Sequence, residues 1–118
     1  MKVLLVDDEQ KFITMLAKRL KFRGINPTVV TSGEDALKRS AEQSYDVAVL
    51  DIKMPGISGI ELKYELAAIQ KNLKFIFVTG HGCICNDEEC FQSDEICLPK
   101  PLDIDTLIKT MKKIVPEI

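Results

Sequence analysis

Hydrophobic residues follow two alternating patterns along this 118-residue chain. One pattern is a short, unbroken apolar run, which is typical of a strand buried on both faces. This pattern predicts strands at residues 3–6, 28–30, 47–50, 73–78 and 95–98. The fourth strand includes the apolar run 75–78, and the last, which begins at Glu95, is weaker. The second run follows Pro27, which predicts a strand at or near the edge of a sheet.

The segments between these runs space their apolar residues three or four positions apart, as the buried face of a helix does. Gly24 is expected to end the first helix, and Ser32 to cap the second. The third helix is expected to open at Ser58 or Gly59, and the last to be capped by Asp103. The expected inward residues are Phe12, Ile13, Leu16 and Leu20, then Ala36, Leu37 and Ala41, then Ile60, Leu62 and Leu66, and finally Ile104, Leu107, Ile108, Met111 and Ile114.

Strands and helices therefore alternate along the chain, with one weak segment. This alternation predicts an α/β fold of the doubly wound class: a five-stranded parallel sheet with helices on both faces. No repeat or linker interrupts it, so residues 1–118 are expected to form one domain.

The weak segment is residues 80–94, where the alternation requires a fourth helix. Asn86 and Glu89 could form a capping box there. Only Cys90 and Phe91 are apolar after it. We expect a short helix of two turns or less, or an irregular loop.

Composition narrows the function classes. The net charge of −2 and the sequence pI of about 5.4 disfavour direct binding of this segment to nucleic acid. The longest apolar runs have four residues, so no transmembrane helix is expected. The chain starts without a signal-peptide pattern, which predicts a cytoplasmic protein with reduced cysteine thiols.

Polar residues follow four of the predicted strands: the pair Asp7 and Asp8, then Asp51, Thr79 and Lys100. The carboxyl ends of parallel strands share one edge of the sheet, where ligands bind. Three carboxylates crowded there repel one another, and a hard cation such as Mg²⁺ relieves that repulsion. A lysine and a hydroxyl beside them could hold a small tetrahedral anion. The set predicts a phosphoryl-transfer site with a carboxylate nucleophile.

Taken together, these residues resemble the receiver domain of two-component response regulators over essentially the whole chain. The resemblance is carried by the stretches Val6-Asp7-Asp8-Glu9, Leu50-Asp51-Ile52-Lys53-Met54-Pro55-Gly56, Thr79-Gly80-His81-Gly82 and Pro99-Lys100-Pro101. It implies the flavodoxin-like strand order 2-1-3-4-5. It also implies a signalling phosphoacceptor rather than a turnover enzyme, with catalysis limited to its own phosphorylation and dephosphorylation.

The resemblance assigns roles to individual residues. Asp51 would take a phosphoryl group from a phosphohistidine of a sensor histidine kinase or a phosphotransfer protein. Asp8, Asp51 and the backbone carbonyl of Lys53 would bind Mg²⁺, with Asp7 assisting through water. Thr79 and Lys100 would contact the phosphoryl group. The Lys100-Pro101 peptide bond is usually cis in this family.

The output of such a domain is a population shift of a distant face. In the family that face comprises the fourth helix, the fifth strand and the fifth and last helix. It contacts a downstream effector domain or protein, or it forms a homodimer. Here Cys97 stands three residues before Lys100, where the family usually has Tyr or Phe. The ring of that residue moves with the threonine, so Thr79 and Cys97 are the predicted switch residues, and the switch is expected to be altered.

Two further hypotheses compete with a phosphorylation switch. All four cysteines, Cys83, Cys85, Cys90 and Cys97, lie within fifteen residues, which suggests a metal or redox sensor or else buried hydrophobic thiols. The other hypothesis is a phosphorylation-independent interaction module with the same fold. A phosphatase of the haloacid-dehalogenase type is disfavoured, because Lys53 occupies the position of its general acid.

Overall fold

The computed structural model describes residues 1–80, 96–100 and 102–115. Its elements, in chain order, are β1 (Val3–Val6), α1 (Gln10–Phe22), β2 (Thr28–Val30), α2 (Gly33–Glu42), β3 (Val47–Asp51), α3 (Gly59–Ile69), β4 (Lys74–Thr79), β5 (Ile96–Pro99) and α4 (Ile104–Ile114).

The strands form one parallel sheet in the order β2-β1-β3-β4-β5, which confirms the predicted flavodoxin-like order. β2 lies at one edge, as Pro27 indicated. The register sets Val6 opposite Leu50 and Asp51 opposite Val78. The carboxyl ends of β1, β3 and β4 therefore lie side by side.

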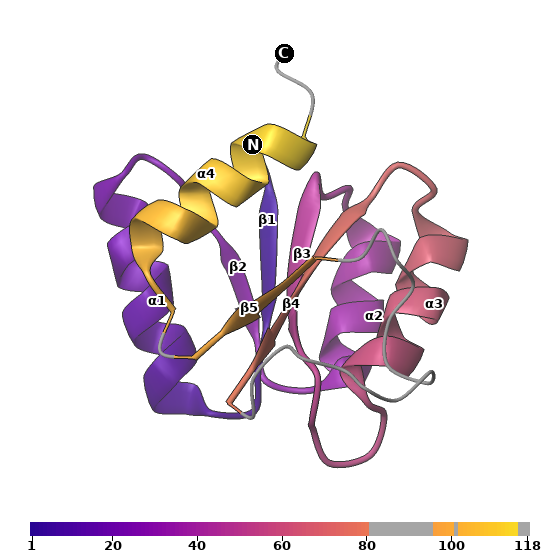
Figure 1. The fold of residues 1–118 in the computed structure, drawn as a ribbon. Coiled ribbons are helices and arrows are strands. Elements are labelled where there is room, and N and C mark those ends of the chain that lie inside the picture. Colours follow the sequence, from indigo (N-terminus) through magenta and orange to yellow (C-terminus); the bar gives the residue numbers. More distant parts are fainter. Residues whose placement is uncertain (81–95, 101, 116–118) are drawn as a thin grey trace.

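Helices cover both faces of the sheet (Figure 1). α1 and α4 lie on one face, and α2 and α3 lie on the other. All four residues of β1 are buried because its side chains alternate between the two cores. Val3 and Leu5 belong to the core under α1 and α4, whereas Leu4 and Val6 belong to the core under α2 and α3. This double burial explains the unbroken apolar runs in the sequence.

Local signals placed most helix ends correctly. The side chains of Ser32, Ser58 and Asp103 cap α2, α3 and α4, and Ser58 forms a capping box with Glu61. Gly24, with φ of 81°, follows the end of α1. These signals are local, so the sequence alone reveals them.

One inward position was predicted wrongly. Ala41 is exposed, and Ser40 is buried in its place. In a ten-residue helix, a small rotation about the helix axis is enough to bury one residue and expose the next. The strand boundaries moved by one residue, because β4 begins at Lys74 and β5 at Ile96. The predicted fourth helix and the Lys100-Pro101 bond lie outside the described residues.

Cys97 differs from the expectation of a reduced thiol, because it is disulfide-bonded. A sulfur in that bond is not a thiolate, so it cannot ligate a metal as one. The sequence shows that the cysteines are close along the chain but not which sulfurs meet. The predictions for Cys83, Cys85 and Cys90 lie outside the described residues.

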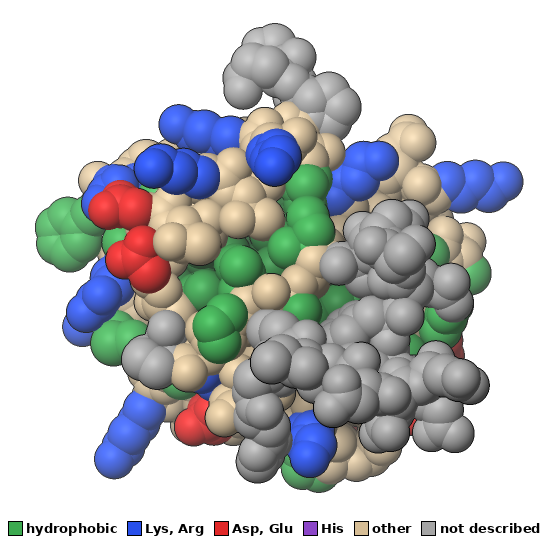
Figure 2. All heavy atoms as spheres, viewed as in Figure 1, with side chains coloured by type: hydrophobic (Ala, Val, Ile, Leu, Met, Phe, Trp, Pro, Cys, Tyr) green, Lys and Arg blue, Asp and Glu red, His purple; other side chains and the backbone are tan. Residues whose placement is uncertain are grey.

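Most charged side chains on one face of the molecule are basic. On the face shown in Figure 2, lysine and arginine side chains project from the rim, several of them over α4, with neutral and apolar surface between them. Within the described ranges, no helix combines the length and apolar character needed to cross a bilayer.

Gln70, the residue after α3, joins α3 to the segment between α2 and β3, at the end of the sheet opposite the acidic edge. Its side-chain Oε1 accepts a hydrogen bond from the backbone N–H of Tyr45 at 2.9 Å. Its Nε2 donates to the backbone carbonyls of Ser40 and Gln43 at 2.9 and 2.8 Å. One side chain thus fixes the turn that leads from α2 into β3.

Replacing Gln70 by Ala is expected to lower the free energy of unfolding by about 1–3 kcal/mol, since backbone groups lose their partners. Urea denaturation measures the change. Gln10→Ala, at the exposed first residue of α1, is the matched control and should shift the free energy by less than about 0.5 kcal/mol. Equal losses in both variants would show that Gln70 has no special role.

Candidate functional site

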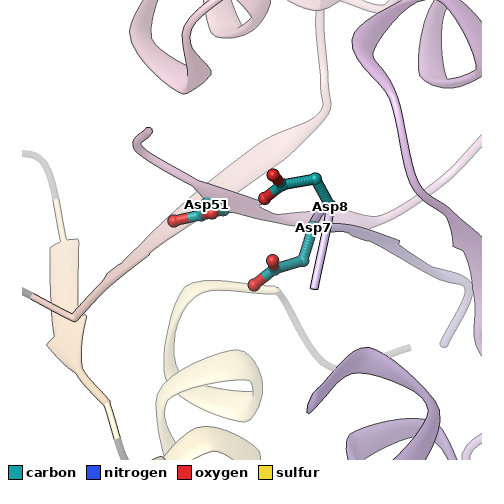
Figure 3. A group of neighbouring side chains, drawn as sticks. All are labelled: Asp7, Asp8 and Asp51. Atoms are coloured by element: carbon teal, nitrogen blue, oxygen red, sulfur yellow. The ribbon is translucent and has the colours of Figure 1, made fainter. Parts of the chain in front are cut away.

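Three carboxylates meet at the carboxyl edge of the sheet. Asp7 and Asp8 follow β1, and Asp51 is the last residue of β3. One carboxylate oxygen of each lies within 4.8 Å of the others, and Figure 3 shows the three side chains gathered at these strand ends. Asp7 and Asp51 are buried, at 2% and 7% exposure, whereas Asp8 is exposed. The predicted acidic cluster therefore exists.

Lys100 supplies the positive charge beside this cluster. Its Nζ lies 2.9 Å from Asp7 Oδ2, 2.6 Å from Glu9 Oε1 and 3.9 Å from Asp51 Oδ1. The ammonium also lies 4.5 Å from the centre of the Phe12 ring, a cation–π contact. Lys100 thus joins the acids as predicted, but it contacts Asp7 and Glu9 more closely than Asp51.

Two opposing influences act on the Lys100 ammonium. Burial alone would lower the pKa of Lys100, but hydrogen bonds to Glu9 and Asp7 and the charges of Asp7 and Asp51 together raise the pKa above its ordinary value. Lys100 is therefore a permanent cation at neutral pH. The sequence reasoning missed both Glu9 and Phe12 as neighbours of this ammonium.

Asp51 is held in an environment that resists its ionisation. Burial is the largest cause, followed by the negative charge of Asp7, and together they raise the pKa of Asp51 to about 6. Lys100 and a hydrogen bond from the backbone of Lys53 oppose this, and the charge of Asp8 adds to it. The carboxylate at this position therefore carries excess free energy until a cation neutralises it.

The loop after Asp51 is fixed by two glycines. Gly56, in the Pro55-Gly56 turn, has φ of 81°, which favours glycine. The N–H of Gly59 donates to the carbonyl of Ile52 at 2.9 Å. A Cβ added to Gly59 would overlap the backbone carbonyl of Asp51. The start of α3 therefore packs directly on the backbone of β3's last residue.

Thr79 and Lys53 lie at the same edge. Thr79 is the buried last residue of β4, and its carbonyl accepts a hydrogen bond from the Lys100 backbone N–H at 2.8 Å. Lys53 has an exposed side chain, and its backbone is hydrogen-bonded to Asp51. The phosphoryl contact of Thr79 and the metal contact of the Lys53 carbonyl stay predictions.

Cys97, the second predicted switch residue, lies away from the acidic edge. It pairs with Phe77 in the register of β4 and β5, two positions before Thr79 meets Pro99. It packs against the core under α2 and α3. Its switch role also stays a prediction.

A doubly wound parallel sheet with clustered carboxylates and a lysine at its carboxyl edge defines an α/β signalling or ligand-binding domain of the flavodoxin-like kind. The chain belongs to the response regulator receiver domain family, whose model matches residues 3–112.

Two of the curated relatives that the chain matches are similar over nearly their whole length. The chain is 29% identical to the response regulator receiver protein CpdR of Brucella abortus over 115 residues, covering 97% of this chain and 96% of that protein. It is 28% identical to the sporulation initiation phosphotransferase F of Bacillus subtilis, covering 98% and 94%. It is also 30% identical to the transcriptional regulatory protein ZraR of Escherichia coli, covering 94% of this chain but 25% of ZraR.

Solved structures of response regulators are also similar to this chain. The response regulator TrrA of Thermotoga maritima, in complex with Mg²⁺-BeF, gives a TM-score of 0.82 at 34% identity, covering 96% of this chain and 97% of that one. A chain in the structure of the histidine kinase ThkA in complex with TrrA gives 0.84 at 33%, covering 98% of each. The family and the fold are thus shown by sequence and by structure.

Asp51→Asn is expected to stabilise the metal-free protein at pH 7 by about 1–3 kcal/mol. Because the folded pKa of Asp51 is raised from 3.8 to about 6, the folded state binds the proton more tightly than the unfolded state. Asp51 therefore makes stability fall as pH rises from about 4 to about 6, and the deficit persists above that range.

Urea denaturation in chelator, repeated from pH 4 to pH 8, measures this effect. The variant should lose the fall in stability between pH 4 and pH 6, and should match the parent most closely at pH 4. Asp35→Asn, at an exposed aspartate in the first turn of α2, serves as the control. If the Asp51→Asn variant is no more stable than the parent at pH 7, the ionised Asp51 carboxylate does not destabilise the fold and the argument is wrong.

Gly59→Ala is expected to lower the free energy of unfolding by about 1–3 kcal/mol, because the added methyl displaces the backbone at Asp51. Gly80→Ala is the control, since a Cβ there would meet no atom of the described residues within 4 Å. Urea denaturation of both variants separates the close approach at Gly59 from a general glycine effect. A similar loss in both would contradict the packing argument.

Proposed function

We propose that residues 1–118 form a cytoplasmic receiver domain that accepts a phosphoryl group on Asp51. The donor is a phosphohistidine of a sensor histidine kinase or a phosphotransfer protein. The observation that carries the proposal is the convergence of Asp7, Asp8 and Asp51 within 4.8 Å, with the Lys100 ammonium beside them.

In the proposed step a carboxylate oxygen of Asp51 attacks the phosphorus of the donor. The new O–P bond forms as the P–N bond breaks, and the imidazole leaves with the bonding pair and takes a proton from water. Asp51 must be ionised to attack, so its pKa of about 6 leaves it competent at neutral pH. Lys100 and the hydroxyl of Thr79 are the groups that would pair with the phosphoryl oxygens.

The residues at this edge fit Mg²⁺, because their donors are carboxylate oxygens from three side chains, one of them exposed. Asp8, Asp51 and the carbonyl of Lys53 would hold the ion, with Asp7 acting through water. When bound, Mg²⁺ would neutralise the acidic cluster and the charge on the transferred group. The similarity to TrrA, solved in complex with Mg²⁺-BeF, supports this assignment.

The same comparisons support the proposed partners. TrrA forms a complex with the histidine kinase ThkA, and ZraR is a transcriptional regulatory protein, so a kinase upstream and an effector domain or protein downstream are the proposed partners. The output face would include β5 and α4, where a homodimer could also form. Cys97 in β5 carries no aromatic ring, so Thr79 would couple to this face by a route other than ring rotation.

Acetyl phosphate with Mg²⁺ should label the intact protein with one phosphoryl group, detected by mass spectrometry and assigned to Asp51 by peptide mapping. Asp51→Asn should abolish the label, because an amide is not a competent nucleophile here. Asp35→Asn, which also removes one carboxylate, should retain it. Absence of labelling in the parent, or unchanged labelling in Asp51→Asn, would refute the proposed function.

A further inference from the structure

The shortest ion pair of Lys100 is with a residue outside the acidic cluster. Its Nζ lies 2.6 Å from Glu9 Oε1 but 3.9 Å from Asp51 Oδ1, which is too long for a hydrogen bond. Phe12 belongs to α1, the helix that begins directly after Glu9, and the centre of its ring lies 4.5 Å from the ammonium. Glu9 and Phe12, together with Asp7 at 2.9 Å, thus hold the ammonium away from Asp51, and the contact with Glu9 is the shortest.

The fold does not need the Glu9 carboxylate. Glu9 occupies the N-cap position of α1, yet its side chain makes no capping hydrogen bond. Its side chain is 62% exposed, and its backbone carbonyl accepts the N–H of Ile13 whatever the side chain is. The contact with Lys100 is therefore the feature that distinguishes this side chain.

We propose that Glu9 is a positioning residue that keeps the Lys100 ammonium away from Asp51 until an anion arrives there. This inference rests on the proposed function, because the anion it concerns is the phosphoryl group on Asp51. Glu9 thereby biases the resting site toward the divalent cation and against the tetrahedral anion.

Two effects of Glu9 oppose the anion. A phosphoryl group on Asp51 must draw the ammonium from its contact with Glu9, and a close charged hydrogen bond resists that movement. The carboxylate of Glu9 also repels an anion that enters a site already rich in acids. Both effects raise the free energy of the anion-bound state.

The same two effects favour the cation. Glu9 adds negative charge next to Asp7 and Asp8, which attracts a divalent ion. By helping Asp7 to hold Lys100 at 3.9 Å from Asp51, it also leaves the Asp51 carboxylate less neutralised by the ammonium. A single side chain should therefore influence the two ligands in opposite directions, and the site should load the cation before the anion.

Glu9→Gln tests the proposal, because glutamine keeps the shape and removes the charge. Glu65→Gln, at an exposed glutamate of α3, is the control with the same change in net charge. Calorimetric titration at constant ionic strength gives the Mg²⁺ affinity. Fluorine NMR with saturating Mg²⁺ then gives the affinity for beryllofluoride, the probe for a phosphoryl group.

In Glu9→Gln we expect the Mg²⁺ affinity to fall by about two- to fivefold and the beryllofluoride affinity to rise by a similar factor, the scale of an exposed ion pair. Glu65→Gln should leave both unchanged. A residue that merely supports the fold would weaken both ligands together, so the opposite signs are diagnostic. Thermal unfolding should show that both variants are folded.

Three outcomes would overturn the inference alone: beryllofluoride affinity equal to that of Glu65→Gln, weaker binding of both ligands, or Mg²⁺ affinity that does not fall. In each of these cases the parent protein still binds beryllofluoride, so the proposed function stands. A parent protein that binds no beryllofluoride in saturating Mg²⁺ would overturn the proposed function and this inference together.

Discussion

The mutual repulsion of three carboxylates at the ends of buried strands governs the site. The register of β1 against β3 leaves no freedom to separate them, because Val6 is fixed opposite Leu50 and both strands are covered on both faces. Burial of Asp51, with the charge of Asp7 as the second cause, raises the pKa of Asp51, and Lys100 lies in contact with the acids. The stability of the sheet is what holds these charges in an unfavourable arrangement, and a bound cation or a proton relieves it.

Much of the fold could be predicted because its determinants are local or periodic. Apolar runs gave the strands, and Ser32, Ser58 and Asp103 marked helix starts through side chains that bond within one turn. The acidic cluster was also predictable, since parallel strands bring their carboxyl ends to one edge. The prediction that Ala41 is buried was wrong, because the apolar spacing of a short helix does not define the rotation of the helix to within one residue.

The contacts that the sequence did not reveal join side chains from segments that are far apart along the chain. Glu9 and Lys100 are 91 positions apart, and nothing in either neighbourhood indicates which acid the ammonium prefers. Phe12 was expected only as an inward helix residue, yet its ring also faces a cation. The disulfide bond at Cys97 belongs to the same class, because cysteine spacing does not determine which sulfurs approach.

The geometry also limits how an event at Asp51 can reach the rest of the molecule. The backbone N–H of Lys100 donates to the carbonyl of Thr79, so the ends of β4 and β5 are joined into one unit. Cys97 lies two residues inside that unit, in the core under α2 and α3, and a covalent sulfur bond restrains it. If Asp51 is phosphorylated as proposed, the backbone contact between Thr79 and Lys100 is a direct link from the acidic edge to β5. The Lys100 side chain is the part of this unit that reaches the acids, with its Nζ 2.6 Å from Glu9 Oε1 and 2.9 Å from Asp7 Oδ2.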